Sequence, residues 1–272
     1  MPEGDTVWRT ARRLHEVLAD QILVTSDFRV PAYSNVDLTG SRVREVVSRG
    51  KHLLLRAEPG LTVHTHLKMD GSWHLYRVGS RWRGPGFQVR LVLATADWVC
   101  VGFRLGLVEV MRTAAEESAV GHLGPDLLGP DWDLDEAMRR LTRARERPVG
   151  EALLDQRNLA GIGNLYQSEA CFVAGVDPRT PVALVPALDR LVESAHRLLD
   201  SNKDRVRQTT TGDLRRGQNT WVYLRGGRPC RRCRSTVVSQ HLGEPGRERL
   251  TFWCPHCQPP KAPAVVDGRA EG

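Results

Sequence analysis

Two pairs of cysteines constrain the C-terminal part of this chain more than any other feature. Cys230 and Cys233 form one Cys-x2-Cys unit, and Cys254 and Cys257 form a second unit after twenty intervening residues. This spacing is typical of a zinc ribbon, in which a β-hairpin brings two pairs of thiolates into a tetrahedron. Four thiolates leave no position for water, so we expect one structural zinc ion that supplies folding energy. Chance pairing of buried or redox-active cysteines is the alternative interpretation.

The remaining sequence is first β-rich and then helical. Short apolar runs, partly β-branched and separated by Gly, Pro or Asp, fill residues 21–110 and predict a β-sandwich or barrel. An amphipathic pattern over residues 5–20 predicts a helix capped by Asp5 or Thr6. Residues 121–133 hold three glycines and two prolines and predict a linker. Helical patterns follow over 134–145, 149–156, 164–174 and 185–199.

These patterns predict an α+β fold with an N-terminal β-sandwich, flanking helices, a C-terminal helical domain and a zinc-ribbon finger. The expected boundaries are a sandwich over 1–120, a linker over 121–133, a helical domain over 134–218, a finger over 219–258 and a tail over 259–272. The tail is rich in Pro, Ala and Gly, which predicts disorder.

Composition excludes several classes of protein. Hydrophobic residues make up 40% of the 272 residues, which is enough for about two domains with cores of their own. No apolar run reaches the roughly 18 residues of a membrane helix, and the best one, 91–103, is interrupted by Asp97. The first residues include Glu3 and Asp5 in place of the basic and apolar stretches of a secretion signal. We therefore expect a cytoplasmic protein without a membrane partner.

Basic residues favour a nucleic-acid partner. The net charge is +7, and seven arginines stand against two glutamates between Arg225 and Arg249. Because a guanidinium group binds phosphate through two parallel hydrogen bonds, an arginine-rich ribbon in a basic protein predicts a contact with nucleic acid. A solvated basic hairpin is the alternative.

The chain opens Met1-Pro2-Glu3-Gly4. Removal of Met1 would expose a secondary amine on Pro2, and an α-amino group has a reference pKa near 8, so a usable fraction is neutral at pH 7. Such an amine can attack an electrophilic sugar carbon and form an iminium, with Glu3 as a neighbouring proton donor. A frayed terminus is the alternative.

A second short motif, Gly161-Ile162-Gly163-Asn164, precedes one of the predicted helices. Glycines permit close approach of the backbone, and a helix N-terminus offers unpaired N–H groups to a phosphate, to which Asn164 could add a side-chain hydrogen bond. A simple turn between two helices explains the pattern equally well.

Together these features resemble the formamidopyrimidine-DNA glycosylase and endonuclease VIII family of base-excision repair enzymes. The order and spacing of the matching motifs agree along nearly the whole chain, and the Pro-Glu-Gly opening is most similar to the actinobacterial endonuclease VIII branch. The resemblance implies a helix–two-turn–helix motif in the helical domain. The matching segments are Pro2-Glu3, 49–53 (Arg-Gly-Lys-His-Leu), 66–69 (His-Leu-Lys-Met), 123–126 (Leu-Gly-Pro-Asp), 155–169 and 249–258.

The resemblance also implies a mechanism and a partner. A bifunctional DNA glycosylase and AP lyase would flip the lesion nucleotide out of the stack. The Pro2 amine would attack C1′ with Glu3 as proton donor, and the Schiff base would undergo β,δ-elimination. Lys51 matches a lysine that contacts phosphate and donates a proton, while Asn164 and Arg249 match residues that hold phosphates around the lesion. The implied partner is damaged DNA, duplex or single-stranded, and we expect a monomer associated with the nucleoid.

Three positions match the family less closely. Met69 stands where the family places a residue that fills the space left by the extruded base, and ordinary core packing is its alternative. Arg104, with Leu105, lies near the second such loop, although the surrounding residues differ from the family's Arg-Arg-Phe. Thr6 replaces a second glutamate that the family usually carries, so rate or lesion range can differ.

The alternatives to a glycosylase are a non-catalytic or lyase-only binder of damaged or abasic DNA and a ribbon protein of ribosomes or transcription. Pro2, Glu3 and Lys51 together argue against a pure binder, and the ribbon alone would not explain the N-terminal signature. If the protein is a glycosylase, its short segment 208–221 favours oxidised pyrimidines as substrates over 8-oxoguanine. In the formamidopyrimidine branch a longer loop at this place contributes to the recognition of 8-oxoguanine.

Overall fold

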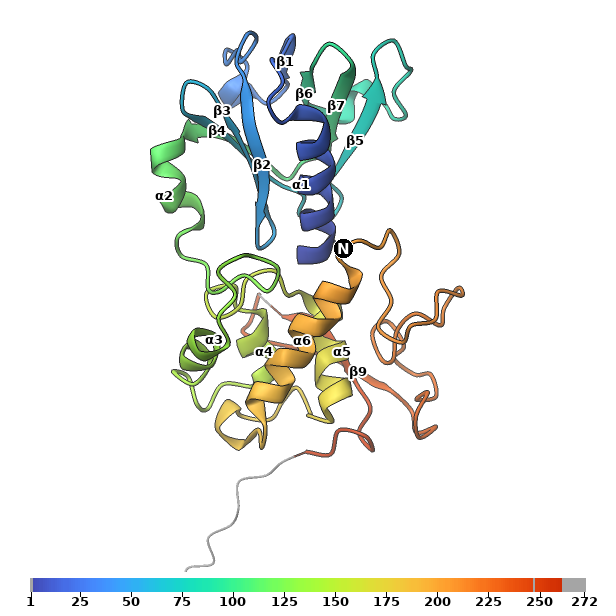
Figure 1. Cartoon of the computed structure of the whole chain (residues 1–272). Helices are drawn as coiled ribbons and strands as arrows, with labels where there is room; N and C mark the ends of the chain where they lie inside the picture. Colours follow the sequence, from blue (N-terminus) through green and yellow to red (C-terminus); the bar gives the residue numbers. More distant parts are fainter. Residues whose placement is uncertain (1, 247, 261–272) are drawn as a thin grey trace, which may run out of the picture. The chain divides into compact units, whose positions relative to one another are not determined.

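The structure of the chain, a computed structural model, describes residues 2–246 and 248–260 (Figure 1). Met1 and most of the tail that was predicted to be disordered, 261–272, lie outside the described residues. The backbone separates into two units. The first holds Met1–Trp132, Leu159–Gly161 and Leu199–Val206, and the second holds Asp133–Asn158, Ile162–Leu198 and Arg207–Gly272.

Two antiparallel four-stranded sheets form the first unit. One has the strand order β1-β6-β7-β5 and the other the order β2-β3-β4-β8. The strands are β1 (Thr25–Phe28), β2 (Val43–Arg49), β3 (His52–Ala57), β4 (Leu61–His66), β5 (Ser72–Arg77), β6 (Val89–Ala94), β7 (Trp98–Phe103) and β8 (Leu107–Arg112). Leu55 of one sheet and Leu93 and Cys100 of the other belong to a single buried cluster, so the sheets share one core and form the predicted β-sandwich.

Helix α1 (Gly4–Leu18) covers this core and lies against β2 (Figure 1). Its apolar residues Val7, Ala11, Leu14 and Leu18 recur at helical spacing and are all buried, as the amphipathic pattern predicted. The predicted cap was wrong: the helix begins one residue earlier, Glu3 is the N-cap residue, and its side chain makes no capping hydrogen bond. A short helix, α2 (Glu116–Val120), follows β8.

The second unit is helical. It contains α3 (Leu134–Leu141), α4 (Val149–Leu154), α5 (Asn164–Ala174) and most of α6 (Leu188–Asn202). The bounds of α5 agree with the prediction. Helix α6 starts three residues late, because Pro186 disfavours helical geometry at Val185 before it. Helix α4 ends early, where Asp155 takes an extended backbone.

A two-stranded hairpin completes the second unit. Strand β9 (Val238–Leu242) pairs antiparallel with β10 (Arg249–Trp253), and the two Cys-x2-Cys units flank this hairpin. Phe252 and Val237 pack with Phe172 of α5 in one buried cluster, so the finger is continuous with the helical core. The sandwich, the helical domain and the finger together confirm the predicted fold class.

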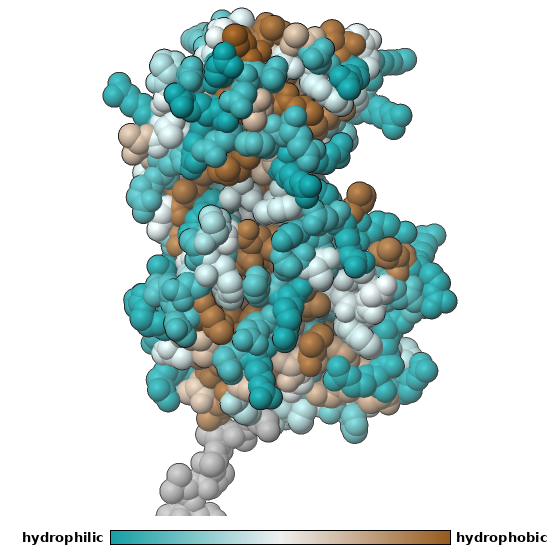
Figure 2. Space-filling model, in the orientation of Figure 1, coloured by the Kyte–Doolittle hydropathy of each residue, from teal (hydrophilic) through white to brown (hydrophobic). Residues whose placement is uncertain are grey.

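The surface is mainly hydrophilic on the face shown in Figure 2, where apolar side chains gather only in small patches. Among the described residues, no helix combines the length and the apolar composition that a membrane span needs.

Candidate active site and metal centre

Residues Pro2 and Glu3 are held in place by the chain that precedes α5. The N–H group of Gly4 donates a hydrogen bond of 2.9 Å to the carbonyl oxygen of Gly161. A Cβ atom at position 4 would lie 2.9 Å from the Cα of Gly161, so a side chain has no room there. Glu3 is completely buried and Pro2 is half-buried. These two residues are packed, and the alternative of a frayed terminus does not describe them.

The turn that carries Lys51 packs against the same segment of chain, Ala160–Gly161. Lys51 sits with Gly50 in the turn between β2 and β3. The N–H group of Gly50 donates a 2.6 Å hydrogen bond to Oδ2 of Asp126. A Cβ at Gly50 would lie 3.0 Å from the Cβ of Ala160. The turn that carries Lys51 and the residues Pro2 and Glu3 therefore both rest on Ala160–Gly161.

Asp126, from the Leu-Gly-Pro-Asp motif, fixes this arrangement. Its Oδ1 atom accepts a hydrogen bond of 3.1 Å from the N–H group of Leu128, in addition to the bond from Gly50. Burial raises the pKa of this carboxyl group, and the two backbone donors lower it. Neighbouring backbone bonds join Ala160 to Pro125 and to Leu127. The Leu-Gly-Pro-Asp motif thus holds Ala160–Gly161 in the place where it supports both Pro2–Glu3 and the Lys51 turn.

Gly161 has a structural role that the sequence did not reveal. Its φ of +97° is a conformation that favours glycine. The close approach inferred from the glycine motif takes place between Gly161 and Gly4.

Met69 and Arg104 lie in two loops that meet at the end of β4. Met69 is 64% exposed, so core packing is the wrong interpretation for it. The neighbouring Leu105, by contrast, is buried. The N–H group of Gly106 donates a 3.0 Å hydrogen bond to the carbonyl oxygen of His66, which ties the second loop to the start of the first. Met69 and Arg104 therefore lie on loops that the fold holds together.

Asn164 is hydrogen-bonded, within the second unit, to the strand that carries Arg249. Asn164 is the first residue of α5, and its Nδ2 donates a hydrogen bond of 2.8 Å to the carbonyl oxygen of Leu250 in β10. Its Oδ1 is buried and has no hydrogen-bond partner among the described residues. Arg249 precedes Leu250 and is exposed. The start of α5 is thus hydrogen-bonded to the backbone of β10 at the residue that follows Arg249.

Two family models match the chain. One is described as the formamidopyrimidine-DNA glycosylase N-terminal domain and matches residues 1–105, and the other is described as the formamidopyrimidine-DNA glycosylase H2TH domain and matches residues 123–210. The chain belongs to the formamidopyrimidine-DNA glycosylase family.

Two relatives of this glycosylase-family chain carry names of the branch that the sequence predicted. The chain is 56% identical over 266 residues to a protein of Streptomyces coelicolor named "Probable endonuclease 8 2", covering 97% of this chain and 96% of that one. It is 46% identical over 258 residues to the "DNA-(apurinic or apyrimidinic site) lyase Nei2" of Mycolicibacterium smegmatis, covering 95% and 99%. These relatives confirm the resemblance to actinobacterial endonuclease VIII proteins.

A solved structure shows the same fold. The structure of Lactococcus lactis Fpg with DNA that contains an abasic site matches with a TM-score of 0.79 at 21% identity, covering 94% of this chain and 99% of that one. The sandwich, the helices and the finger of this family member thus follow the formamidopyrimidine-DNA glycosylase architecture.

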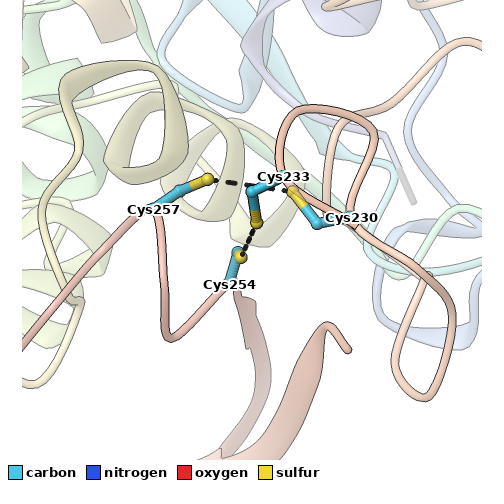
Figure 3. Close-up of side chains that lie close together, drawn as sticks. All are labelled: Cys230, Cys233, Cys254 and Cys257. Carbon is cyan, nitrogen blue, oxygen red and sulfur yellow. Dashed lines mark hydrogen bonds between the residues drawn. The ribbon is translucent and has the colours of Figure 1, made fainter. Parts of the chain in front are cut away.

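The four finger cysteines of this glycosylase-family protein form a tight cluster that could hold a metal ion. Their side chains point toward one another (Figure 3), and their sulfur atoms all lie within 4.8 Å of one another. The Sγ atoms of Cys230 and Cys257 are 3.9 Å apart, and those of Cys233 and Cys254 are 3.4 Å apart. A tetrahedral ion with bonds of about 2.3 Å places its sulfur ligands about 3.8 Å apart, so the cluster can hold a metal ion.

The family motif at 155–169 ends at Glu169, for which the sequence suggested no role. This carboxylate is fully buried in α5 and accepts hydrogen bonds from the N–H groups of Trp221, Val222 and Tyr223 at 2.7 to 2.8 Å, and from the hydroxyl of Thr210. Burial raises the pKa of Glu169, while these donors favour its ionised form. Glu169 therefore fixes the chain that leads into the finger.

A pocket of about 200 Å³ beside Pro2 was not foreseen. Thr6, Arg9, Thr10 and Arg13 line it from α1, and Leu67, Gly71 and residues 72–75 line it from the loop after β4 and from β5. The signal was present in the sequence, because these four residues recur at three- and four-residue steps on the polar side of the amphipathic helix.

A cluster of histidines near Lys51 was also missed. Nδ1 of His52 lies 2.8 Å from Nε2 of His64, and the rings of His66 and His122 meet the His52 ring edge to face. Burial, and then the neighbouring imidazoles and Lys68, lower the pKa of His52 to about 3. Burial, followed by Lys68, lowers the pKa of His66 to about 4. Both rings are therefore neutral at pH 7.

Proposed function

We propose that this protein is a bifunctional DNA glycosylase and AP lyase of base-excision repair that removes oxidised bases, with oxidised pyrimidines favoured. The observation that carries the proposal is the common support of Pro2–Glu3 and of the Lys51 turn by Ala160–Gly161. An amine, a carboxyl group and a lysine are the groups that Schiff-base chemistry at a sugar needs. The names of the relatives, endonuclease 8 and AP lyase, support the same activity.

In the proposed reaction the lesion nucleotide leaves the duplex, since its C1′ atom cannot be reached inside the stack. The nitrogen of the Pro2 amine forms a bond to C1′ as the bond from C1′ to the base breaks, and the base leaves with the bonding electron pair and takes up the proton that the amine loses. Glu3 then gives a proton to O4′ as the bond from C1′ to O4′ breaks, which opens the sugar ring and forms the double bond from C1′ to nitrogen. The resulting iminium acidifies C2′, so β-elimination expels the 3′ phosphate and δ-elimination then expels the 5′ phosphate. Lys51 holds a phosphate beside the lesion and donates a proton.

DNA is the proposed partner, as damaged duplex or as a single strand. Asn164 and Arg249 would bind backbone phosphates and set the position of the strand without reading its sequence. The buried Oδ1 of Asn164 is an acceptor, so it is Nδ2 and the N–H groups at the start of α5 that suit phosphate oxygens. Met69 and Arg104, on their adjoining loops, would occupy the space left by the extruded nucleotide. The protein would act as a monomer in the cytoplasm, close to the nucleoid.

The metal at the four cysteines is proposed to be one structural zinc ion. A set of four thiolates suits zinc and leaves no open coordination position, so the ion would supply folding energy to the finger and take no part in the reaction.

Borohydride trapping tests the activity. Chain with a free Pro2 amine should form a covalent adduct with duplex DNA that carries 5-hydroxyuracil, thymine glycol or an abasic site. In a blocked variant, a short N-terminal extension covers the amine. Its matched control carries the same extension at the C-terminus. Full capture by the blocked protein would refute the role of Pro2. Capture on abasic DNA alone would make the protein a lyase, and binding without any capture would leave a non-catalytic binder.

A further inference from the structure

The pocket beside Pro2 has two kinds of wall. Leu67, which follows β4, and Trp73 and Leu75 of β5 supply apolar surface. Arg9 and Arg13 of α1, with the hydroxyl groups of Thr6, Thr10 and Ser72, supply polar surface. A pocket with both kinds of surface suits a flat heterocycle, because the ring face packs on carbon while the ring substituents form hydrogen bonds.

The polar wall is rich in donors. Two guanidinium groups line the pocket, and no carboxylate is among the described residues that line it. The Nη1 atom of Arg9 is buried and has no hydrogen-bond partner among the described residues. Because a buried donor without an acceptor is costly, this atom favours a ligand that brings an acceptor. The hydroxyl of Thr10 donates to the backbone carbonyl of Thr6 at 2.7 Å, so its oxygen can only accept a further bond.

The pocket lies beside Pro2, whose amine is the proposed nucleophile. Pro2 itself contributes to the wall, and the stripe of Thr6, Arg9 and Arg13 continues from it along α1. Gly71, in the loop that carries Met69, closes the same pocket. A group bonded to a sugar carbon that Pro2 attacks would therefore have this pocket next to it.

We propose that the pocket receives the extruded oxidised base, and that Arg9 recognises its oxygen acceptors. The inference rests on the proposed function and adds to it a specificity-determining residue and a ligand chemistry. The preferred base carries two oxygens on neighbouring ring carbons, as do the 4-carbonyl and 5-hydroxyl groups of 5-hydroxyuracil and thymine glycol, because the fork of a guanidinium group donates two parallel hydrogen bonds. A backbone phosphate shares the acceptor chemistry but makes no use of the apolar wall formed by Trp73.

An abasic site separates these two sources of the acceptor, because it keeps the phosphates and lacks the base. We would measure the single-turnover rate of borohydride-trapped adduct on 5-hydroxyuracil DNA and on abasic DNA of the same sequence. In Arg9→Gln the ratio of the two rates should fall by about 10- to 100-fold, which corresponds to the loss of one charge-assisted hydrogen bond. Arg12→Gln is the matched control: Arg12 lies on the same helix outside the pocket, and its ratio should equal that of the unaltered protein.

Arg9→Lys separates charge from geometry and guards against a folding defect. It keeps the positive charge without the fork, so base recognition predicts a reduced ratio here too, whereas simple attraction to phosphate predicts an unchanged one. Equal losses on both DNAs in Arg9→Gln would assign the pocket to phosphate and overturn the proposal, as would an unchanged ratio. If the unaltered protein formed no adduct on either DNA, the proposed function itself would fail.

Discussion

The N–H group of Gly4 and the carbonyl oxygen of Gly161 are joined by a 2.9 Å hydrogen bond, across a contact too close for any side chain at position 4. Residues 157 positions apart in the sequence thereby determine where Pro2 and Glu3 lie. The Pro-Glu-Gly opening, which indicated one branch of the family, has its physical reason in this contact.

Gly4→Ala should destabilise the protein and slow adduct formation. A Cβ at this position would lie 2.9 Å from the Gly161 backbone, and relief of that clash would shift Pro2. Overpacking of this kind costs about 1–3 kcal/mol, which exceeds the gain of about 0.5–1 kcal/mol that alanine usually brings to a helix. Thermal unfolding and trapping on abasic DNA would measure both effects. Gly86→Ala is the control, since a Cβ there meets nothing within 4 Å; equal melting temperatures for the two variants would contradict the argument.

Asp126→Asn should act on the Lys51 turn. Asp126 accepts one backbone hydrogen bond on each carboxylate oxygen, and an amide can replace only one of them. The N–H group of Gly50 or of Leu128 then loses its acceptor, at about 1–3 kcal/mol. We expect a lower melting temperature and slower adduct formation than in the control Asp97→Asn, whose side chain is exposed. Unimpaired adduct formation in Asp126→Asn would show that this clamp does not position Lys51.

Metal removal should affect the finger more than the sandwich. Cys230 and Cys254 belong to the buried cluster that joins the hairpin to Phe172, so loss of the ion should loosen β9 and β10 and displace Arg249. A chelator should therefore weaken binding to abasic DNA, and zinc should restore it, with about one zinc ion per chain by elemental analysis. Hydrogen exchange should rise in the hairpin and stay constant in β3 and β4. Unchanged affinity after complete removal of the metal would show that the finger is dispensable.

The sequence predicted the elements whose signal is local. The limits of α5 follow from the Gly-x-Gly-Asn turn before it and from Gly175, which closes it in a left-handed conformation. The clustering of the four finger cysteines follows from their spacing alone. The N-cap of α1 was missed, because the tertiary contact of Gly4 with Gly161 sets the start of the helix and no capping side chain does so.

Residues whose role depends on distant neighbours could not be predicted in this way. For the motif of Gly161 the sequence left a phosphate site and a simple turn equally open, since nothing local indicates that Gly4 packs on Gly161. The partners of Glu169 lie more than forty residues away, so its role in ordering the finger connection emerges only in three dimensions. Arg9 carries a local signal, the polar stripe of α1, but this stripe becomes the wall of a pocket only because β5 and the loop before it pack beside it.

The histidine cluster predicts a loss of stability in weak acid. His52 and His66 have pKa values of about 3 and 4 in the folded chain, against about 6.5 when unfolded. Between these pKa values the two rings bind protons in the unfolded chain and not in the folded chain. Their contribution to the free energy of unfolding is therefore fully present above pH 6.5 and falls as the pH drops toward 4. The loss is at most about 1.4 kcal/mol per pH unit for each ring. Denaturant unfolding at several pH values would measure the slope. It should be shallower in His52→Gln, which removes the ring that faces His64, His66, His122 and Lys68, and unaltered in His241→Gln, whose side chain is exposed. If both variants kept the full slope, the acid sensitivity would come from other groups and the buried state of His52 would not be its cause.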